Sequence, residues 1–209
     1  MVSSFLPGHP SGTLRFVMKE HWASSRHYDF RLQLAGMLVS WAMPKGPSMR
    51  PGERRQAISV PLHGMGGANF EGVIRPGRYG AGPVMVWDRG IYAPLGSDVR
   101  AENPGLRTRL NVMEQQVWQG LNSGKLRFVL HGEKLNGAWS LIRDGWQSRR
   151  EIWWLVKESD DFADPARDLL KENRSILTRR TMEEILRGKR DDEVDGGSGS
   201  SQPPLPNLF

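Results

Sequence analysis

The chain has 209 residues, a formal net charge of +6 at pH 7 and no cysteine, so disulfide bonds and thiolate metal sites are excluded. No apolar run reaches the ~20 residues that span a bilayer, and the first residues lack the pattern of a signal peptide. The positive charge favours polyanionic partners, because phosphate contacts release condensed counterions, although many basic proteins have other roles. We expect an intracellular monomer, in the cytoplasm and nucleoid or in a nucleus, with no membrane partner.

Composition divides the chain into four segments. Residues 1–13 are rich in Ser, Gly and Pro and predict a flexible leader. Residues 14–160 are expected to form the main domain, and residues 161–190 a C-terminal helical extension. Residues 191–209 are first charged and then rich in Gly, Ser and Pro, which predicts a disordered tail.

The main domain has the pattern of short β-strands. Runs rich in β-branched and aromatic residues are separated by Gly, Pro, Asn and Asp. The runs are TLRFVMKEH, HYDFRLQL, MLVSWAM, RQAISVPL, PVMVWDRGIYAPL, GKLRFVLHG, AWSLIRD and EIWWLVKES. Hairpin turns are expected at Ala35-Gly36 and at Asn136-Gly137. The pattern predicts a mainly β protein, an antiparallel barrel or sandwich with a helical insert and C-terminal helices.

Two stretches have helical patterns instead. Residues 106–122 carry apolar side chains at helical spacing. These side chains are Leu106, Leu110, Met113, Val117 and Leu121. Nearer the C-terminus, Asp164 followed by proline is a candidate helix start. Thr181 with Glu184 predicts a capping box, and Gly188 is a candidate helix end.

The run RHYDFRLQL, residues 26–34, alternates two kinds of side chain. In a strand, successive side chains point to opposite faces. The core-type set is Tyr28, Phe30, Leu32 and Leu34. The polar set is His27, Asp29 and Arg31. One strand would therefore bury one face in the core and present three side chains capable of chemistry on the other.

A further histidine, His21, lies six residues before His27, close enough to fold back across a turn. Two imidazoles and one carboxylate, from His21, His27 and Asp29, would form a facial triad that suits Mn²⁺, Fe²⁺ or Zn²⁺. Arg31 beside the metal could grip two phosphate oxygens with its planar fork. The alternative is that the His-x-Asp pair only forms a hydrogen bond or faces solvent.

Other parts of the chain favour the metal interpretation. Lys45 follows an X-Pro step, and the run RRQAISVPLH contains Arg55 and His63. FEGVIRPGRYGAG is a glycine-punctuated loop that could approach a ligand closely. Each residue also has a simpler interpretation. Lys45 and Arg55 could be solvated surface charges, and His63 could be an ordinary histidine at a strand end.

Several motifs together resemble the 3′-phosphoesterase domain of bacterial DNA ligase D, a family with stand-alone relatives. The motifs are KEHWASSRHYDFRLQLAGMLVSWAMPKGPS, FEGVIRPGRYGAG, VMVWDRG and KLRFVLHGEKLNGAWSLIR, within about residues 14–157. The resemblance implies a β-barrel with a crescent groove and a Mn²⁺-dependent enzyme, with Zn²⁺ or Co²⁺ as other candidate ions. It implies removal of 3′-terminal ribonucleotides by a phosphodiesterase step, then hydrolysis of the remaining 3′-phosphate, in double-strand-break repair.

The resemblance also implies roles for individual residues. The implied metal ligands are His21, His27 and Asp29. The implied phosphate-binding residues are Arg31, Lys45, Arg55 and His63, of which Arg31 and His63 are catalytic. The chain departs from the family at Pro61, where relatives carry glutamate, at Gly67, where they carry an active-site tyrosine, and at Gln33. We therefore expect the phosphodiesterase step to be stronger than 3′-phosphate removal.

The expected partners are the 3′ ends of DNA or of DNA/RNA primers, with a DNA ligase, a polymerase or a sliding clamp as protein partners. The C-terminal QPPLPNLF resembles a clamp-docking peptide, through Gln202, Leu205, Leu208 and Phe209. A proline-rich disordered end is the simpler interpretation of that peptide. Two other functions stay open, namely a non-catalytic module that binds nucleic-acid ends and a phosphoesterase that acts on RNA ends.

Overall fold

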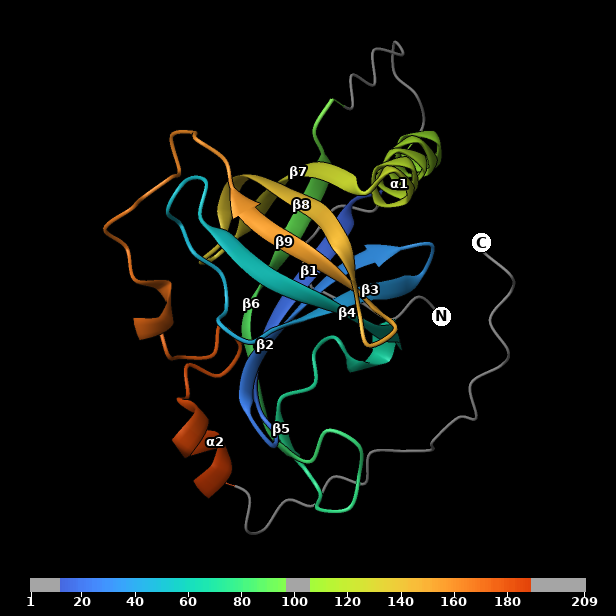
Figure 1. Ribbon diagram of the computed structural model, residues 1–209. Coiled ribbons are helices and arrows are strands. Elements are labelled where there is room, and N and C mark those ends of the chain that lie inside the picture. The colour runs from blue at the N-terminus through green and yellow to red at the C-terminus, as the bar shows by residue number, and fades with distance from the viewer. Residues whose placement is uncertain (1–11, 97–105, 189–209) are drawn as a thin grey trace.

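The computed structural model describes residues 12–96 and 106–188 (Figure 1). The strands are β1 (Leu14–Trp22), β2 (Arg26–Leu34), β3 (Met37–Met43), β4 (Arg54–Gly64), β5 (Gly72–Ile74), β6 (Gly82–Pro94), β7 (Lys125–Gly132), β8 (Asn136–Gln147) and β9 (Arg150–Lys157). All of the predicted runs form strands, and β5 is an additional short strand. The proposed leader and tail fall almost wholly outside the described residues, so the division into domains stays a prediction.

The strands close into an antiparallel barrel. The sheet order is β1-β2-β3-β4-β9-β8-β7-β6-β5, and β1 also pairs with β6. Eight strands therefore form the ring, and β5 extends from β6 outside it. This confirms the mainly β antiparallel barrel and excludes the open sandwich.

An aromatic-rich core fills the barrel. Phe30 of β2 lies 6.1 Å from Trp41 and 6.0 Å from Phe128, measured between ring centroids. Tyr28, Phe30 and Leu32 are at most 2% exposed, which confirms that this face of β2 is the core face. Burying each such side chain contributes on the order of 1.5–3 kcal/mol.

One of the two predicted turns is confirmed and the other is wrong. Ala35 and Gly36 join β2 to β3 with φ of 48° and 75°, the two positive φ values that a tight hairpin requires. The other turn lies earlier than expected, because Asn136 already pairs with His131 inside the sheet. In the turn that forms, the backbone N–H groups of Glu133 and Leu135 donate to the carboxylate of Asp88 on β6, which is far away in sequence.

The predicted insert forms helix α1 (Leu106–Ser123), which buries Val117 against the barrel. The C-terminal part forms less helix than its pattern predicts, with only the 3-10 turn η2 (Leu169–Lys171) and helix α2 (Met182–Arg187) among the described residues. The capping box of Thr181 and Glu184 is confirmed, with Gly188 as the C-cap. Asp164 caps a turn by binding the N–H groups that follow it, and no α-helix begins there.

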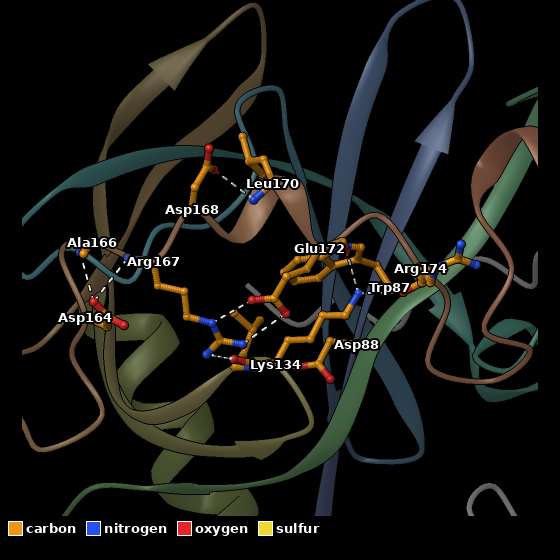
Figure 2. A network of polar contacts seen from close by, with 11 residues as sticks. Trp87, Asp88, Lys134, Asp164, Ala166, Arg167, Asp168, Leu170, Glu172 and Arg174 are labelled. Carbon is orange, nitrogen blue, oxygen red and sulfur yellow. Dashed lines mark hydrogen bonds and ion pairs between the residues drawn. The ribbon is translucent and has the colours of Figure 1, made fainter.

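Barrel contacts explain why the chain after Asp164 is not helical (Figure 2). The Lys134 Nζ donates to the backbone carbonyls of Glu172 and Arg174 at 2.8 and 2.6 Å, so these carbonyls are bound outside a helix. Arg167 pairs with the Glu172 carboxylate at 2.7 Å and also donates to the Lys134 carbonyl. These contacts anchor the C-terminal segment along one side of the barrel (Figure 1).

No helix in the described part of the chain is long and apolar enough to cross a membrane. The clamp-like peptide of Gln202, Leu205, Leu208 and Phe209 lies outside the described residues.

Candidate metal centre

The predicted polar residues meet on the outer face of the β1–β2 hairpin. The antiparallel register places His21 opposite His27, and Lys19 opposite Asp29. Arg31 follows two residues later on the same face of β2. Since the alternate residues fill the core, these polar side chains lie together on the face of the hairpin that points away from the core.

In each candidate ligand, one polar atom forms a hydrogen bond within the protein, and a second polar atom could coordinate a metal. The Nε2 of His21 donates to the Gly80 carbonyl at 2.8 Å, and the Nδ1 of His27 donates to the Ser25 carbonyl at 3.0 Å. These bonds favour the tautomers that carry a lone pair on His21 Nδ1 and on His27 Nε2. A hydrogen bond from the second ring nitrogen to a carbonyl is the usual support of a metal-binding histidine.

The carboxylate of Asp29 is divided in the same way. Its Oδ2 accepts a hydrogen bond from Arg31 Nη2 at 2.8 Å, and its Oδ1 lies 3.6 Å from His27 Nε2. Arg31 is only 8% exposed, and its Nε has no hydrogen-bond partner among the described residues. Arg31 therefore fixes Asp29 and retains donor capacity of its own.

The resulting donor set comes close to the spacing of a metal site. One ligand atom from each of His21, His27 and Asp29 lies within 4.8 Å of the others. Two ligands of one ion, each about 2.1 Å away from it, are at most roughly 4.2 Å apart, so the cluster is close to the required geometry. Burial, and then the neighbouring His27, lowers the pKa of His21, which favours the neutral ring that binds metals.

His63 reaches the same face from β4. Its Nδ1 lies 3.0 Å from the Ser40 hydroxyl, which in turn donates to the Leu38 carbonyl. This chain of bonds places the proton on Nδ1 and leaves the lone pair on Nε2. Burial, followed by the charge of Arg31, lowers the pKa of His63 to about 4, so the ring is neutral at pH 7.

Lys19 is a site residue that the sequence interpretation missed. It is 2% exposed, and its Nζ donates to the carbonyls of Gly67 and Phe70 at 2.5 and 2.9 Å. Burial, and then Arg31, lowers its pKa to about 7. The signal was present in the alternation, because Lys19 precedes His21 by two residues and so shares its face.

The loop after His63 is shaped by Lys19 and by Glu71. The Glu71 carboxylate accepts hydrogen bonds from the Val86 N–H and from the hydroxyls of Ser175 and Thr178. Glu71 therefore joins this loop to the C-terminal segment, a role that the FEG motif did not reveal. Gly67 is exposed, and a Cβ added there would meet nothing within 4 Å.

The structure does not bring Lys45 and Arg55 into the cluster. Arg55 pairs with Glu53 at 3.0 Å and also donates to the Lys45 carbonyl at 3.5 Å. Arg55 shares its face of β4 with the fully buried Ala57, whereas His63 lies opposite Leu38 on the outer face. Phosphate binding by Lys45 and Arg55 stays a prediction.

Comparisons with known proteins point to one family. The family model of the DNA ligase D 3′-phosphoesterase domain matches residues 19–143. The multifunctional non-homologous end joining protein LigD of Pseudomonas aeruginosa is 43% identical over 175 residues, which are 82% of this chain and 19% of that protein. The corresponding DNA repair protein LigD of Mycobacterium tuberculosis is 36% identical over 138 residues, 65% of this chain and 16% of its own.

A third relative, the LigD protein of Mycolicibacterium smegmatis, is 30% identical over 180 residues, covering 85% of this chain and 21% of its own. The chain thus spans about a fifth of the length of these relatives. The matched residues 19–143 contain the whole polar face described above, from Lys19 to His63.

Proposed function

The chain belongs to the family of DNA ligase D 3′-phosphoesterase domains, and from this premise we propose that it is a metal-dependent phosphoesterase acting on nucleic-acid 3′ ends. The convergence of His21, His27 and Asp29 within 4.8 Å carries the proposal. The relatives are named for non-homologous end joining, and we extend that role in DNA repair to this chain. A ligase or a polymerase acting on the same end would be its partner.

The donor set fits a borderline-to-hard divalent cation, because imidazole and carboxylate both suit Mn²⁺, Zn²⁺ and Co²⁺. His21 would bind through Nδ1, His27 through Nε2 and Asp29 through Oδ1. The bound ion would neutralise phosphate charge and lower the pKa of coordinated water. We propose Mn²⁺ as the native ion.

Arg31 would act on the phosphate directly. Its guanidinium is held by Asp29, and its buried Nε has no partner among the described residues. A guanidinium fixed in this way can donate to non-bridging phosphate oxygens without reorganising during the reaction. Arg31 would therefore orient the ester and stabilise the negative charge that develops on it.

His63 would accept a proton. With its pKa near 4 it is neutral at pH 7, and the Ser40 contact leaves the lone pair on Nε2. A neutral imidazole in this tautomer suits removal of a proton from the attacking hydroxyl, either water or the 2′-OH of a terminal ribonucleotide. The imidazolium that results would then help to balance the phosphate charge.

The decisive experiment is a product analysis on a labelled DNA primer that ends in one ribonucleotide, with Mn²⁺ and with EDTA. We expect Mn²⁺-dependent removal of the ribonucleotide, and faster than release of phosphate from a 3′-phosphate primer. Equal activity in EDTA would contradict the metal proposal. Tight binding of the end without any product would favour the end-binding alternative, and a preference for all-RNA ends would favour the RNA-end phosphoesterase.

A further inference from the structure

The loop that joins β5 to β6 touches the candidate metal cluster of His21, His27 and Asp29 and carries an exposed aromatic residue. Tyr79 is 89% exposed, whereas its neighbour Gly80 accepts the hydrogen bond from the candidate ligand His21 at 2.8 Å. Resting on the function proposed above, we propose that Tyr79 stacks on the base of the substrate's 3′-terminal nucleotide. It would be a substrate-positioning residue next to the candidate metal ligands.

Hydrogen bonds hold the backbone of this loop. The Arg78 N–H donates to the Arg75 carbonyl at 3.3 Å, and the Ala81 N–H donates to the Arg78 carbonyl at 3.1 Å. Gly80 has a φ of 73°, and a Cβ there would lie 3.3 Å from the His21 ring, so glycine is required at this contact. Two consecutive turns and one bond to His21 therefore fix the backbone on both sides of Tyr79.

The position suits a base more than any other part of the substrate. Tyr79 directly precedes Gly80, whose carbonyl orients His21, and consecutive Cα atoms are about 3.8 Å apart. The backbone of Tyr79 therefore lies close to His21. A phosphate held at His21 and Arg31 leaves its attached nucleoside within reach of that ring. Arg78, also exposed, adds positive charge to the same loop. Because every base has a π-face, stacking on Tyr79 would grip an end of any sequence.

The test compares two primers that differ only in whether the 3′-terminal ribonucleotide carries a base. With the normal end, we expect Tyr79→Ala to raise KM about tenfold and to leave kcat within about twofold. With the abasic end, wild type and Tyr79→Ala should have the same KM, since the partner of the ring is gone. Tyr79→Phe should behave as wild type, because stacking needs the ring and not the hydroxyl. An equal loss on both primers, or no loss on either, would overturn the proposal.

A binding measurement separates this inference from the proposed activity. A primer with 2-aminopurine as its terminal base should lose fluorescence when wild type binds it in EDTA, and the loss should disappear in Tyr79→Ala. Trp118→Ala is the matched control, because Trp118 is a partly exposed aromatic on α1, far from β5 in Figure 1. Quenching without any turnover would contradict the enzyme and support the stacking, whereas turnover with unchanged fluorescence in all variants would overturn the stacking alone.

Discussion

Two clusters of charged side chains lie on the barrel, and they differ in how many of their polar atoms form hydrogen bonds within the protein. In the network of Figure 2, Lys134 donates to two carbonyls, and both oxygens of Asp88 accept backbone N–H groups. In the metal cluster, by contrast, His21, His27 and Asp29 each use one atom on the protein and turn another toward the same point.

The difference is the one expected between a structural network and a ligand site. Buried polar groups almost always find partners, so a closed network needs no ligand to explain it. A set of half-engaged donors that converge on one region is the arrangement typical of a ligand site, because each engaged atom orients the other atom of its side chain. The comparison predicts that substitutions in the two clusters have opposite effects on activity and stability.

The largest effect is expected at the metal cluster. Asp29→Asn keeps the size of the side chain but weakens the anionic ligand, and we expect turnover of a 3′-ribonucleotide primer to fall by at least about 10³-fold. His21→Ala and His27→Ala should have similar effects. Urea unfolding should show a much smaller loss of stability than in the network variant below. Mn²⁺ binding measured by calorimetry should weaken in parallel, and full activity in Asp29→Asn would contradict the assignment.

Lys134→Met should lower stability and leave activity nearly unchanged. It removes two charge-assisted hydrogen bonds, which costs about 2–3 kcal/mol of unfolding free energy, while the Glu172 carbonyl keeps its hydrogen bond from Trp87 Nε1 at 2.8 Å. Turnover per folded molecule should stay within about twofold, since the described hydrogen bonds of Lys134 go to backbone carbonyls of the C-terminal segment and none goes to the metal cluster. The control is Lys171→Met, because the Lys171 side chain is 84% exposed and should contribute little. Equal unfolding free energies of Lys134→Met and Lys171→Met would show that the network around Lys134 does not stabilise the fold.

Gly67→Tyr tests the departure from the family beside the metal cluster. A Cβ added at Gly67 meets nothing within 4 Å, so a side chain can start there without a clash. If the missing tyrosine limits the second step, the variant should release phosphate from a 3′-phosphate primer about tenfold faster. Gly66→Tyr is the matched control, because its Cβ position is also open. Rapid 3′-phosphate release by the wild-type protein would show that Gly67 is no handicap.

The smallest effect is a difference in pH dependence. Burial raises the pKa of Asp88 to about 6, so its contribution to stability is present below pH 3.8 and is lost as the pH rises through 6. Burial lowers the pKa of His63 to about 4, so its contribution is present above pH 6.5 and is lost as the pH falls through 4. The two slopes oppose each other in the wild-type protein.

Substitution should uncover each slope. Between about pH 4 and 6.5, the unfolding free energy of Asp88→Asn should rise with pH relative to wild type, and that of His63→Gln should fall. Urea unfolding at several pH values measures both. Parallel curves for the two variants would show that neither group is perturbed as described.

Local patterns predicted the strands and the face of the site well. The alternation in residues 26–34 places Tyr28 and Phe30 inside and His27 and Asp29 outside because the period of a strand depends only on its own backbone. The turn at Asn136 and the helix expected after Asp164 were wrong for the opposite reason. Asp88, far away in sequence, binds a backbone N–H of the β7–β8 turn, and Lys134 binds a backbone carbonyl of the C-terminal segment. These groups are therefore not free to form the local turn or helix that the sequence pattern favours.

The sequence by itself determined which side chains could meet, namely His21, His27, Asp29 and Arg31 on one face of a hairpin. Tertiary structure decided which atom of each side chain faces the common point. That choice depends on the carbonyl of Gly80, 59 residues beyond His21, and on the bond from Arg31 to Asp29. Tertiary structure also decided the protonation of His63. Burial and the charge of Arg31 lower its pKa, and the Ser40 hydroxyl sets its tautomer; no local pattern encodes either effect.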